Sequence, residues 1–143
     1  MVALPAAYHD LLERPLYGHL ATTRPDGAVQ VSPMWFDWDG ELLRFAHTTK
    51  RQKYRNVQSN PRVAMSISDP DNPYRYLEVR GDVERIEPDP AASFFRRIAK
   101  LQRRRTSPRR PAAGRGSLRR PGLGGHRGAP DRVQQALIQR AHQ

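Results

Sequence analysis

Apolar and polar residues alternate along much of the first hundred positions, and this pattern predicts β-strands. Val63, Met65 and Ile67, for example, alternate with polar or small residues, as in a strand with one buried face. The same reasoning predicts five strands, over residues 17–23, 28–37, 41–47, 62–68 and 74–86. Arg24-Pro25-Asp26-Gly27 and Asp39-Gly40 are turn signals, so the first three strands should form a meander.

Three other segments place apolar residues at helical spacing. They span residues 4–13, 50–59 and 91–100. Thr48 and Thr49 are the predicted N-terminal caps of the second helix, and Phe94, Phe95 and Ile98 form the apolar stripe of the third. The order of helix, three strands, helix, two strands and helix predicts a mainly β fold, a small closed antiparallel barrel with flanking helices.

A proline interrupts the second strand. Pro33 cannot donate a backbone hydrogen bond, so the strand should be unpaired or bulged there. The free backbone groups from Gln30 to Phe36 can bind the polar edge of a heterocyclic ring, with apolar side chains covering its face. An ordinary edge bulge with core aromatics is the alternative, and the residues alone favour it.

Charge divides the chain into two parts. Residues 1–100 carry 14 Lys and Arg against 13 Asp and Glu, whereas residues 101–143 carry 11 against 1. All Phe, Trp and Tyr residues also lie in the first hundred positions. We therefore expect a folded domain over 1–100 and a tail over 101–143, rich in Arg, Pro and Gly, that is disordered or encoded out of frame.

The segment from Thr48 to Asn56 carries the sharpest chemical signal. Hydroxyl groups, cations and the free N–H groups of a predicted helix start converge there, and a helix N-terminus attracts anions. A phosphate site and a solvated basic helix face are equally compatible with this spacing. Nucleic acid is a third candidate partner, but the balanced charge of residues 1–100 provides no wider basic surface.

Several function classes lose support. The chain has no cysteine, which excludes disulfides, thiolate metal sites and a cysteine nucleophile. Residues 1–100 contain no hydrolase, P-loop, dinucleotide or zinc-protease motif. His9, His19 and His47 lack ligand spacing, so no metal site is expected. Without a long apolar run, we expect a soluble cytoplasmic protein with no membrane partner.

Five runs in the expected order resemble one known family, the pyridoxamine 5'-phosphate oxidase-like split barrels, and within it the F420-dependent branch. They are Tyr17 to Thr22, Arg24 to Gly27, Val31 to Phe36, Lys53 to Val57 and Asn60 to Ala64. The resemblance spans roughly residues 5–100. It implies a Greek-key split β-barrel of the FMN-binding type that forms a homodimer, with the coenzyme at the subunit interface.

The resemblance also implies positions for the coenzyme. Its phosphate would be held by Thr48, Thr49, Arg51 and Lys53, with support from Lys50 and Asn56. Its ring would be lined by Gln30, Ser32, Pro33, Met34 and Trp35, with Tyr74 and Tyr76 at the edge of the pocket. No residue is obliged to act as an acid or base, and the catalytic residues stay unassigned. This suits hydride transfer, in which the coenzyme supplies the chemistry.

The family pattern stops at Leu101, where a further turn and a final strand are expected. Synonymous codons for residues 101–108, 116–120 and 130–135, read from the second base, yield segments typical of the family. A frameshift is therefore predicted, and with it a barrel that lacks its final strand. The competing interpretation is an Arg-rich arm for nucleic acid or anionic lipid, in which Val133, Ala136, Leu137 and Arg140 form a short helix.

The sequence thus predicts an oxidoreductase that transfers hydride between a (deaza)flavin coenzyme and a small electron-poor substrate. Coenzyme F420 is the leading cofactor. One alternative keeps the barrel but uses FMN, since both coenzymes offer a phosphate and a tricyclic ring. A second alternative is a non-enzymatic protein that binds nucleic acid or another anion through its basic tail.

Overall fold

The structure is a computed structural model that describes residues 4–106 and 132–139. Its elements, in chain order, are η1 (Ala6–Tyr8), α1 (His9–Glu13), β1 (Tyr17–Thr23), β2 (Val29–Trp38), β3 (Leu43–Thr48), α2 (Gln52–Ser59), β4 (Arg62–Ser68), β5 (Tyr76–Pro88), α3 (Ser93–Thr106) and β6 (Arg132–Gln139). The mainly β composition with flanking helices confirms the predicted fold class.

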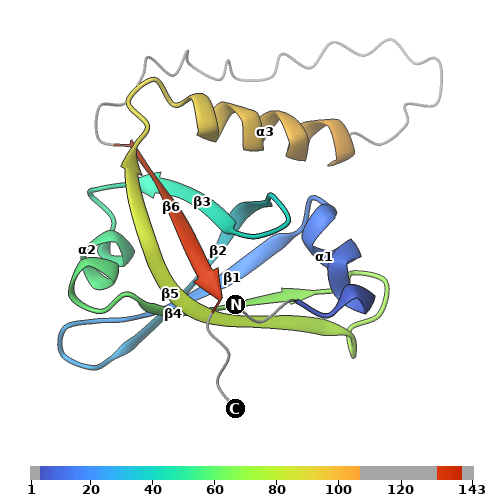
Figure 1. Ribbon diagram of the computed structural model, residues 1–143, viewed down its shortest axis with the longest axis horizontal. Coiled ribbons are helices and arrows are strands. Elements are labelled where there is room, and N and C mark those ends of the chain that lie inside the picture. The colour runs from blue at the N-terminus through green and yellow to red at the C-terminus, as the bar shows by residue number, and fades with distance from the viewer. Residues whose placement is uncertain (1–3, 107–131, 140–143) are drawn as a thin grey trace, which may run out of the picture.

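The six strands form one closed antiparallel barrel in the order β1-β2-β3-β6-β5-β4 (Figure 1). The strands β1, β2 and β3 are sequential neighbours, as the two turn signals predicted. The strand β4 then returns to pair with β1, in a register that sets Leu20 opposite Met65. This arrangement is the predicted split barrel.

Inward-facing side chains fill the barrel. Leu20, Phe45, Met65 and Ile67 are almost completely buried, and burial of each such side chain stabilises the fold by about 1.5–3 kcal/mol. A Cβ atom on Gly18 would overlap the Met65 side chain. A glycine is therefore required where β1 passes closest to the core.

Three helical segments surround the barrel (Figure 1). The helix α1 buries Leu11 and Leu12, and α2 buries Val57. The helix α3 packs against β2 and buries Phe94 and Ile98. None of the helices in the described part of the chain is long and apolar enough to cross a membrane.

The prediction that the barrel lacks its final strand is corrected by β6. This strand lies between β3 and β5, with Phe45 opposite Gln135 and Val83 opposite Leu137. Sequence reasoning expected a disordered or out-of-frame tail here, and only the competing interpretation placed a short helix in it, because some apolar residues had helical spacing. Pairing with the two open edges of the barrel favours a strand instead, since unpaired backbone groups at such edges are costly.

The rest of the predicted tail is only partly described. The helix α3 continues past Lys100 to Thr106, and Gln102 Nε2 donates to the backbone oxygen of Leu16 over 3.3 Å. Residues 107–131 and 140–143 lie outside the described residues. The predicted disorder or frameshift in this segment therefore stays a prediction.

The strand β2 has one partly open edge, as Pro33 predicted. It pairs with β1 through Pro33 itself, which lies opposite His19 without a bulge. On its other side, β2 pairs with β3 only over Phe36–Trp38. The backbone of residues 29–35 is thus unpaired on the β3 side, because proline and the divergence of the strands end the ladder there.

Candidate functional site

A cavity of about 500 Å³ opens beside the unpaired part of β2. Residues from β1, β2, β3, α3 and the start of α2 form its walls. The lining residues are Tyr17, Pro33, Met34, Trp35, Ala46, His47, Thr48, Arg51, Lys53, Phe95 and Ile98. No acidic residue is among them, so the cavity combines positive charge with an apolar surface.

The positive charge comes from the start of α2. The backbone N–H of Arg51 donates to the carbonyl oxygen of Thr48 over 3.1 Å, which forms a tight turn after β3. Arg51 is the N-cap residue of α2, and no side chain caps this helix. The predicted caps Thr48 and Thr49 therefore lie one turn too early, and the first N–H groups of α2 carry no side-chain cap.

Lys53 is the half-buried cation of the site. Its Nζ donates to Ser32 Oγ over 3.1 Å, which joins α2 to β2. Burial lowers the pKa of the Lys53 ammonium below its ordinary value, and the nearby Arg51 charge lowers it further. A lysine in this state gains from an anion beside it, because the anion offsets both effects.

Aromatic side chains form the other wall. The Tyr17 and Trp35 ring centroids lie 6.5 Å apart, and those of Trp35 and Phe95 lie 6.0 Å apart with planes inclined by 28°. Met34 and Ile98 add buried apolar contacts. This wall suits a flat ring system, which can stack on aromatic faces.

Most of the predicted site residues gather around this cavity. Pro33, Met34, Trp35, Thr48, Arg51 and Lys53 line it. Ser32 is tied to it through Lys53. Thr49 and Lys50 lie in the turn before α2 but not in the lining.

Gln30 and Asn56 lie behind the cavity and hold its parts together. Asn56 is fully buried, and its Nδ2 donates to Thr22 Oγ1 over 3.0 Å and to Gln30 Oε1 over 3.1 Å. Its Oδ1 accepts a bond from Gln52 Nε2 over 2.9 Å. Asn56 therefore fastens the first turn of α2 to β1 and β2, and so positions Arg51 and Lys53.

Tyr74 and Tyr76 lie away from the cavity of their own chain. Tyr74 is 93% exposed, in the loop between β4 and β5, and Tyr76 begins β5. Neither residue is in the cavity lining. Within one chain, the structure does not bring these tyrosines together with the other predicted site residues.

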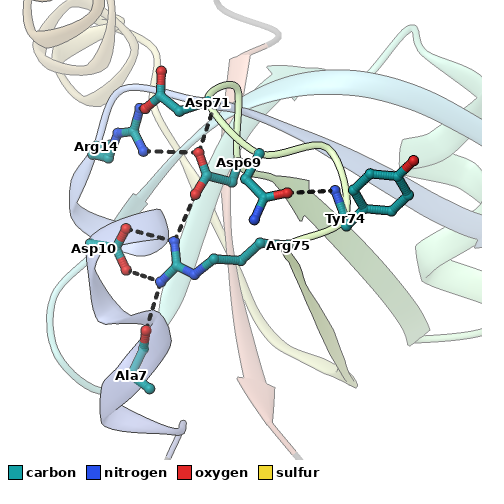
Figure 2. Close-up of polar contacts among 8 residues, drawn as sticks. Ala7, Asp10, Arg14, Asp69, Asp71, Tyr74 and Arg75 are labelled. Carbon is teal, nitrogen blue, oxygen red and sulfur yellow. Dashed lines mark hydrogen bonds and ion pairs between the residues drawn. The ribbon is translucent and has the colours of Figure 1, made fainter.

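An ion cluster braces the loop that carries Tyr74 (Figure 2). Arg75 contacts Asp10 at 2.6 Å and Asp69 at 2.9 Å, and Arg14 contacts Asp69 at 3.4 Å and Asp71 at 2.9 Å. The N–H of Asp71 and the two guanidinium groups lower the pKa of the Asp69 carboxyl. These charges satisfy one another, and they tie α1 to the loop.

Sequence reasoning missed five residues of the lining, namely Tyr17, Ala46, His47, Phe95 and Ile98. Phe95 and Ile98 were recognised only as an apolar helix stripe. The spacing from Phe94 to Ile98 shows which residues share a helix face. It does not show that part of this face borders a cavity rather than the core.

Comparisons with known proteins agree with this architecture. The family model described as pyridoxamine 5'-phosphate oxidase matches residues 4–117. A solved structure described as an F420 reductase is 53% identical, covers 96% of this chain and 97% of that chain, and has a TM-score of 0.78. No curated protein matches the chain.

Two more distant structures share the fold. A putative pyridoxamine 5'-phosphate oxidase from Listeria innocua is 19% identical, covers 94% of this chain and 92% of that one, and has a TM-score of 0.59. A conserved hypothetical protein from Mycobacterium tuberculosis is 22% identical and has a TM-score of 0.61. The match covers 99% of this chain and 83% of that chain. With its barrel, its cavity and a family match over most of its length, the chain belongs to the pyridoxamine 5'-phosphate oxidase-like family.

Proposed function

We propose that this protein is an oxidoreductase that binds coenzyme F420 in the cavity and transfers hydride between it and a small electron-poor substrate. The observation that carries the proposal is the combination of Arg51 and Lys53 with an aromatic wall in a cavity that no acidic residue lines. Family membership and the 53% identical structure described as an F420 reductase support this assignment.

The cationic end of the cavity is proposed to hold the coenzyme phosphate. Arg51 supplies a guanidinium group and Lys53 an ammonium group whose pKa is lowered by burial. The uncapped N–H groups at the start of α2 add donors that suit an anion. Thr48 lines the same end and brings a hydroxyl group. Thr49 and Lys50, in the adjoining turn, are proposed as supporting residues.

The aromatic end is proposed to hold the ring. Trp35 and Phe95 offer flat surfaces, and Pro33 and Met34 lie beside the unpaired backbone of β2. When bound, a deazaflavin ring supplies the hydride chemistry itself. The residues of the chain bind the ring, orient it and exclude water.

FMN is the second candidate coenzyme, because it also combines a phosphate with a tricyclic ring. The 53% identical structure described as an F420 reductase favours F420. Titration of the full-length protein with each coenzyme, followed by fluorescence, tests the choice. We expect F420 to bind more tightly than FMN. Tighter binding of FMN would reverse the cofactor assignment, and binding of neither would overturn the proposed function.

We also propose that the protein works as a homodimer. The outer face of β1 and β2 exposes Val29 (69%), Val31 (60%) and Tyr17, an apolar strip that a second copy can cover. Dimerisation would also give Tyr74 and Tyr76, which are exposed and outside the lining of their own cavity, a place at the cavity of the partner. Sedimentation of Val31→Lys should show monomers where the parent protein is dimeric. Monomers for both proteins would contradict the proposal.

The tail is proposed to result from a shift of reading frame near Leu101. The basis is the contrast between 11 Lys and Arg and a single acidic residue over 101–143. The nucleotide sequence of the gene decides the matter. Codons for residues 101–108 that yield the family-like segment when read from the second base support the shift. Codons that do not yield it contradict the shift.

A further inference from the structure

Asp37 lies where β2, β3 and α3 meet. Its Oδ2 atom accepts from Arg44 Nη2 over 2.7 Å and from Arg97 Nη2 over 2.6 Å. Arg44 is its cross-strand partner on β3, and Arg97 belongs to α3. One carboxylate therefore joins two arginines that come from separate elements.

The two arginines also cover the ring of Phe94. Their Cζ atoms lie 5.7 Å (Arg44) and 5.2 Å (Arg97) from its centroid, within the range of cation–π attraction. Phe94 is buried. We call Asp37, Arg44, Phe94 and Arg97 the α3 clamp, because together they fasten this helix to the sheet.

The clamp lies next to the aromatic wall of the cavity. Trp35 and Asp37 are two positions apart on β2 and so lie on the same face. On α3, Phe95 stacks on Trp35 and Arg97 binds Asp37, so two contacts from this helix reach the same face of β2.

A second attachment fixes only the beginning of the helix. The Asp89 carboxylate accepts from the N–H groups of Phe94 over 3.3 Å and Phe95 over 3.2 Å. This cap holds the first turn of α3, but it leaves the tilt of the helix to contacts farther along. Arg97 is in the second turn, and its ion pair with Asp37 is one of the contacts that set that tilt, together with buried Ile98 and the bond from Gln102 to Leu16.

We propose that Asp37 is a positioning residue for the cavity. By holding Arg97 it keeps Phe95 against Trp35 and fixes the width of the aromatic end. The expected effect of Asp37 on coenzyme binding rests on the proposed function. The expected effect of Asp37 on the solvent exposure of Trp35 does not, so the two effects can be tested separately.

The structural test uses Trp35 as the reporter in full-length protein that carries Trp38→Phe. Asp37→Asn removes the charge but keeps the shape of the side chain. Arg97→Met removes the other partner of the ion pair, and the Arg97 side chain is half-exposed. Asp10→Asn is the matched control, because Asp10 also contacts an arginine at 2.6 Å but lies on α1. Acrylamide quenching of the Trp35 emission is measured for each variant.

We expect Asp37→Asn and Arg97→Met each to raise the quenching constant about twofold, because loss of the stacked Phe95 opens the Trp35 ring to solvent. Asp10→Asn should leave it unchanged. Quenching in both clamp variants equal to that of the control would overturn the proposal.

The binding test titrates the same proteins with F420. Weaker binding in Asp37→Asn and Arg97→Met, by about tenfold, with unchanged binding in Asp10→Asn supports the role of the wall. Unchanged F420 affinity in the two clamp variants, despite increased quenching of Trp35, would show that the aromatic wall does not contribute to coenzyme binding. If the parent protein binds neither F420 nor FMN, the proposed function fails, and the quenching result alone decides whether Asp37 positions the wall.

Discussion

Two groups of cations in this protein have opposite surroundings. Around the β4–β5 loop, Arg14 and Arg75 meet the carboxylates of Asp10, Asp69 and Asp71 (Figure 2). At the start of α2, Arg51 and Lys53 line a cavity to which no acidic residue contributes. The same kind of charge is neutralised in one region and left facing a cavity in the other.

Under the proposed function, the difference separates charges that hold the fold from charges that bind a ligand. The ion cluster joins α1 to the loop, and its partners lower the pKa of Asp10 and Asp69. At α2, burial and a neighbouring cation lower the pKa of Lys53, which means that the folded protein alone disfavours this charge. Such an arrangement is expected where an anion completes the site.

Among the single substitutions, the largest expected effect comes from making the start of α2 resemble the ion cluster. Thr48→Asp would place a carboxylate in the cavity lining, near Arg51 and Lys53. It should weaken F420 binding about 10–100-fold, because the new charge repels the anion and occupies the cations. Fluorescence titration measures the loss. Ser59→Asp, at the exposed last residue of α2 and outside the lining, is the control, and equal losses in both variants would contradict the assignment.

Next in size is the effect of opening the ion cluster. Asp69→Asn removes the carboxylate that Arg14 and Arg75 share, and should lower the Tm by several degrees without changing coenzyme affinity. Asp71→Asn is the control, because its side chain is 80% exposed and contacts Arg14 alone, and exposed pairs contribute little. A Tm equal to that of the control would show that the cluster is not a structural tie.

Lowering the pH should weaken the ion cluster, because its carboxylates become protonated, whereas the cations of the cavity stay charged. The pKa values of Asp10 and Asp69 are lowered in the folded protein, so their contribution to stability is present above their ordinary pKa of about 4 and is lost as the pH falls through the lowered values. Thermal unfolding between pH 6 and pH 3, at about 0.1 M salt, should show a drop in Tm that is smaller in Asp69→Asn. An equal drop in both proteins would contradict this origin.

The smallest expected effect is that of raising the pH, which should weaken coenzyme binding at the start of α2 by removing the charge of Lys53. In the proposed site the charged form of Lys53 binds the anion, and the pKa of Lys53 is lowered in the free protein. Coenzyme affinity should therefore decline as the pH rises through that lowered pKa, below the ordinary value of about 10.4, while the free protein becomes slightly more stable over the same window. In Arg51→Ala the decline should begin at higher pH. A decline at the same pH would show that Arg51 does not lower the pKa.

Local pattern predicted the strands well. The bounds predicted for 17–23 and 62–68 match β1 and β4, because alternation and flanking turns define them fully. The strand β6 was missed because the basic composition of residues 101–143 indicated a disordered or out-of-frame tail. Its conformation depends on the free edges of β3 and β5, which no local pattern contains.

The site was predicted where its residues are adjacent in sequence. The segment from Pro33 to Trp35 and the cations Arg51 and Lys53 were predicted to share a site, and all of them line one cavity. Their ligand stays a prediction. Phe95 was not predicted at this site, because it belongs to α3, far from β2 and α2 in the sequence, and meets Trp35 only in the folded chain. Asn56 was expected to support the phosphate site, and its burial and three hydrogen bonds join α2 to β1 and β2.

The most direct test of the account is a paired measurement on Arg51→Ala/Lys53→Ala. The F420 affinity and the Tm are both measured, with Arg55→Ala as the control, since exposed Arg55 on the same helix contacts Gln52. The account predicts an affinity loss of about 100-fold or more in the double variant, a Tm equal to or above that of the parent, and no change in the control. Unchanged F420 affinity in the double variant would contradict it.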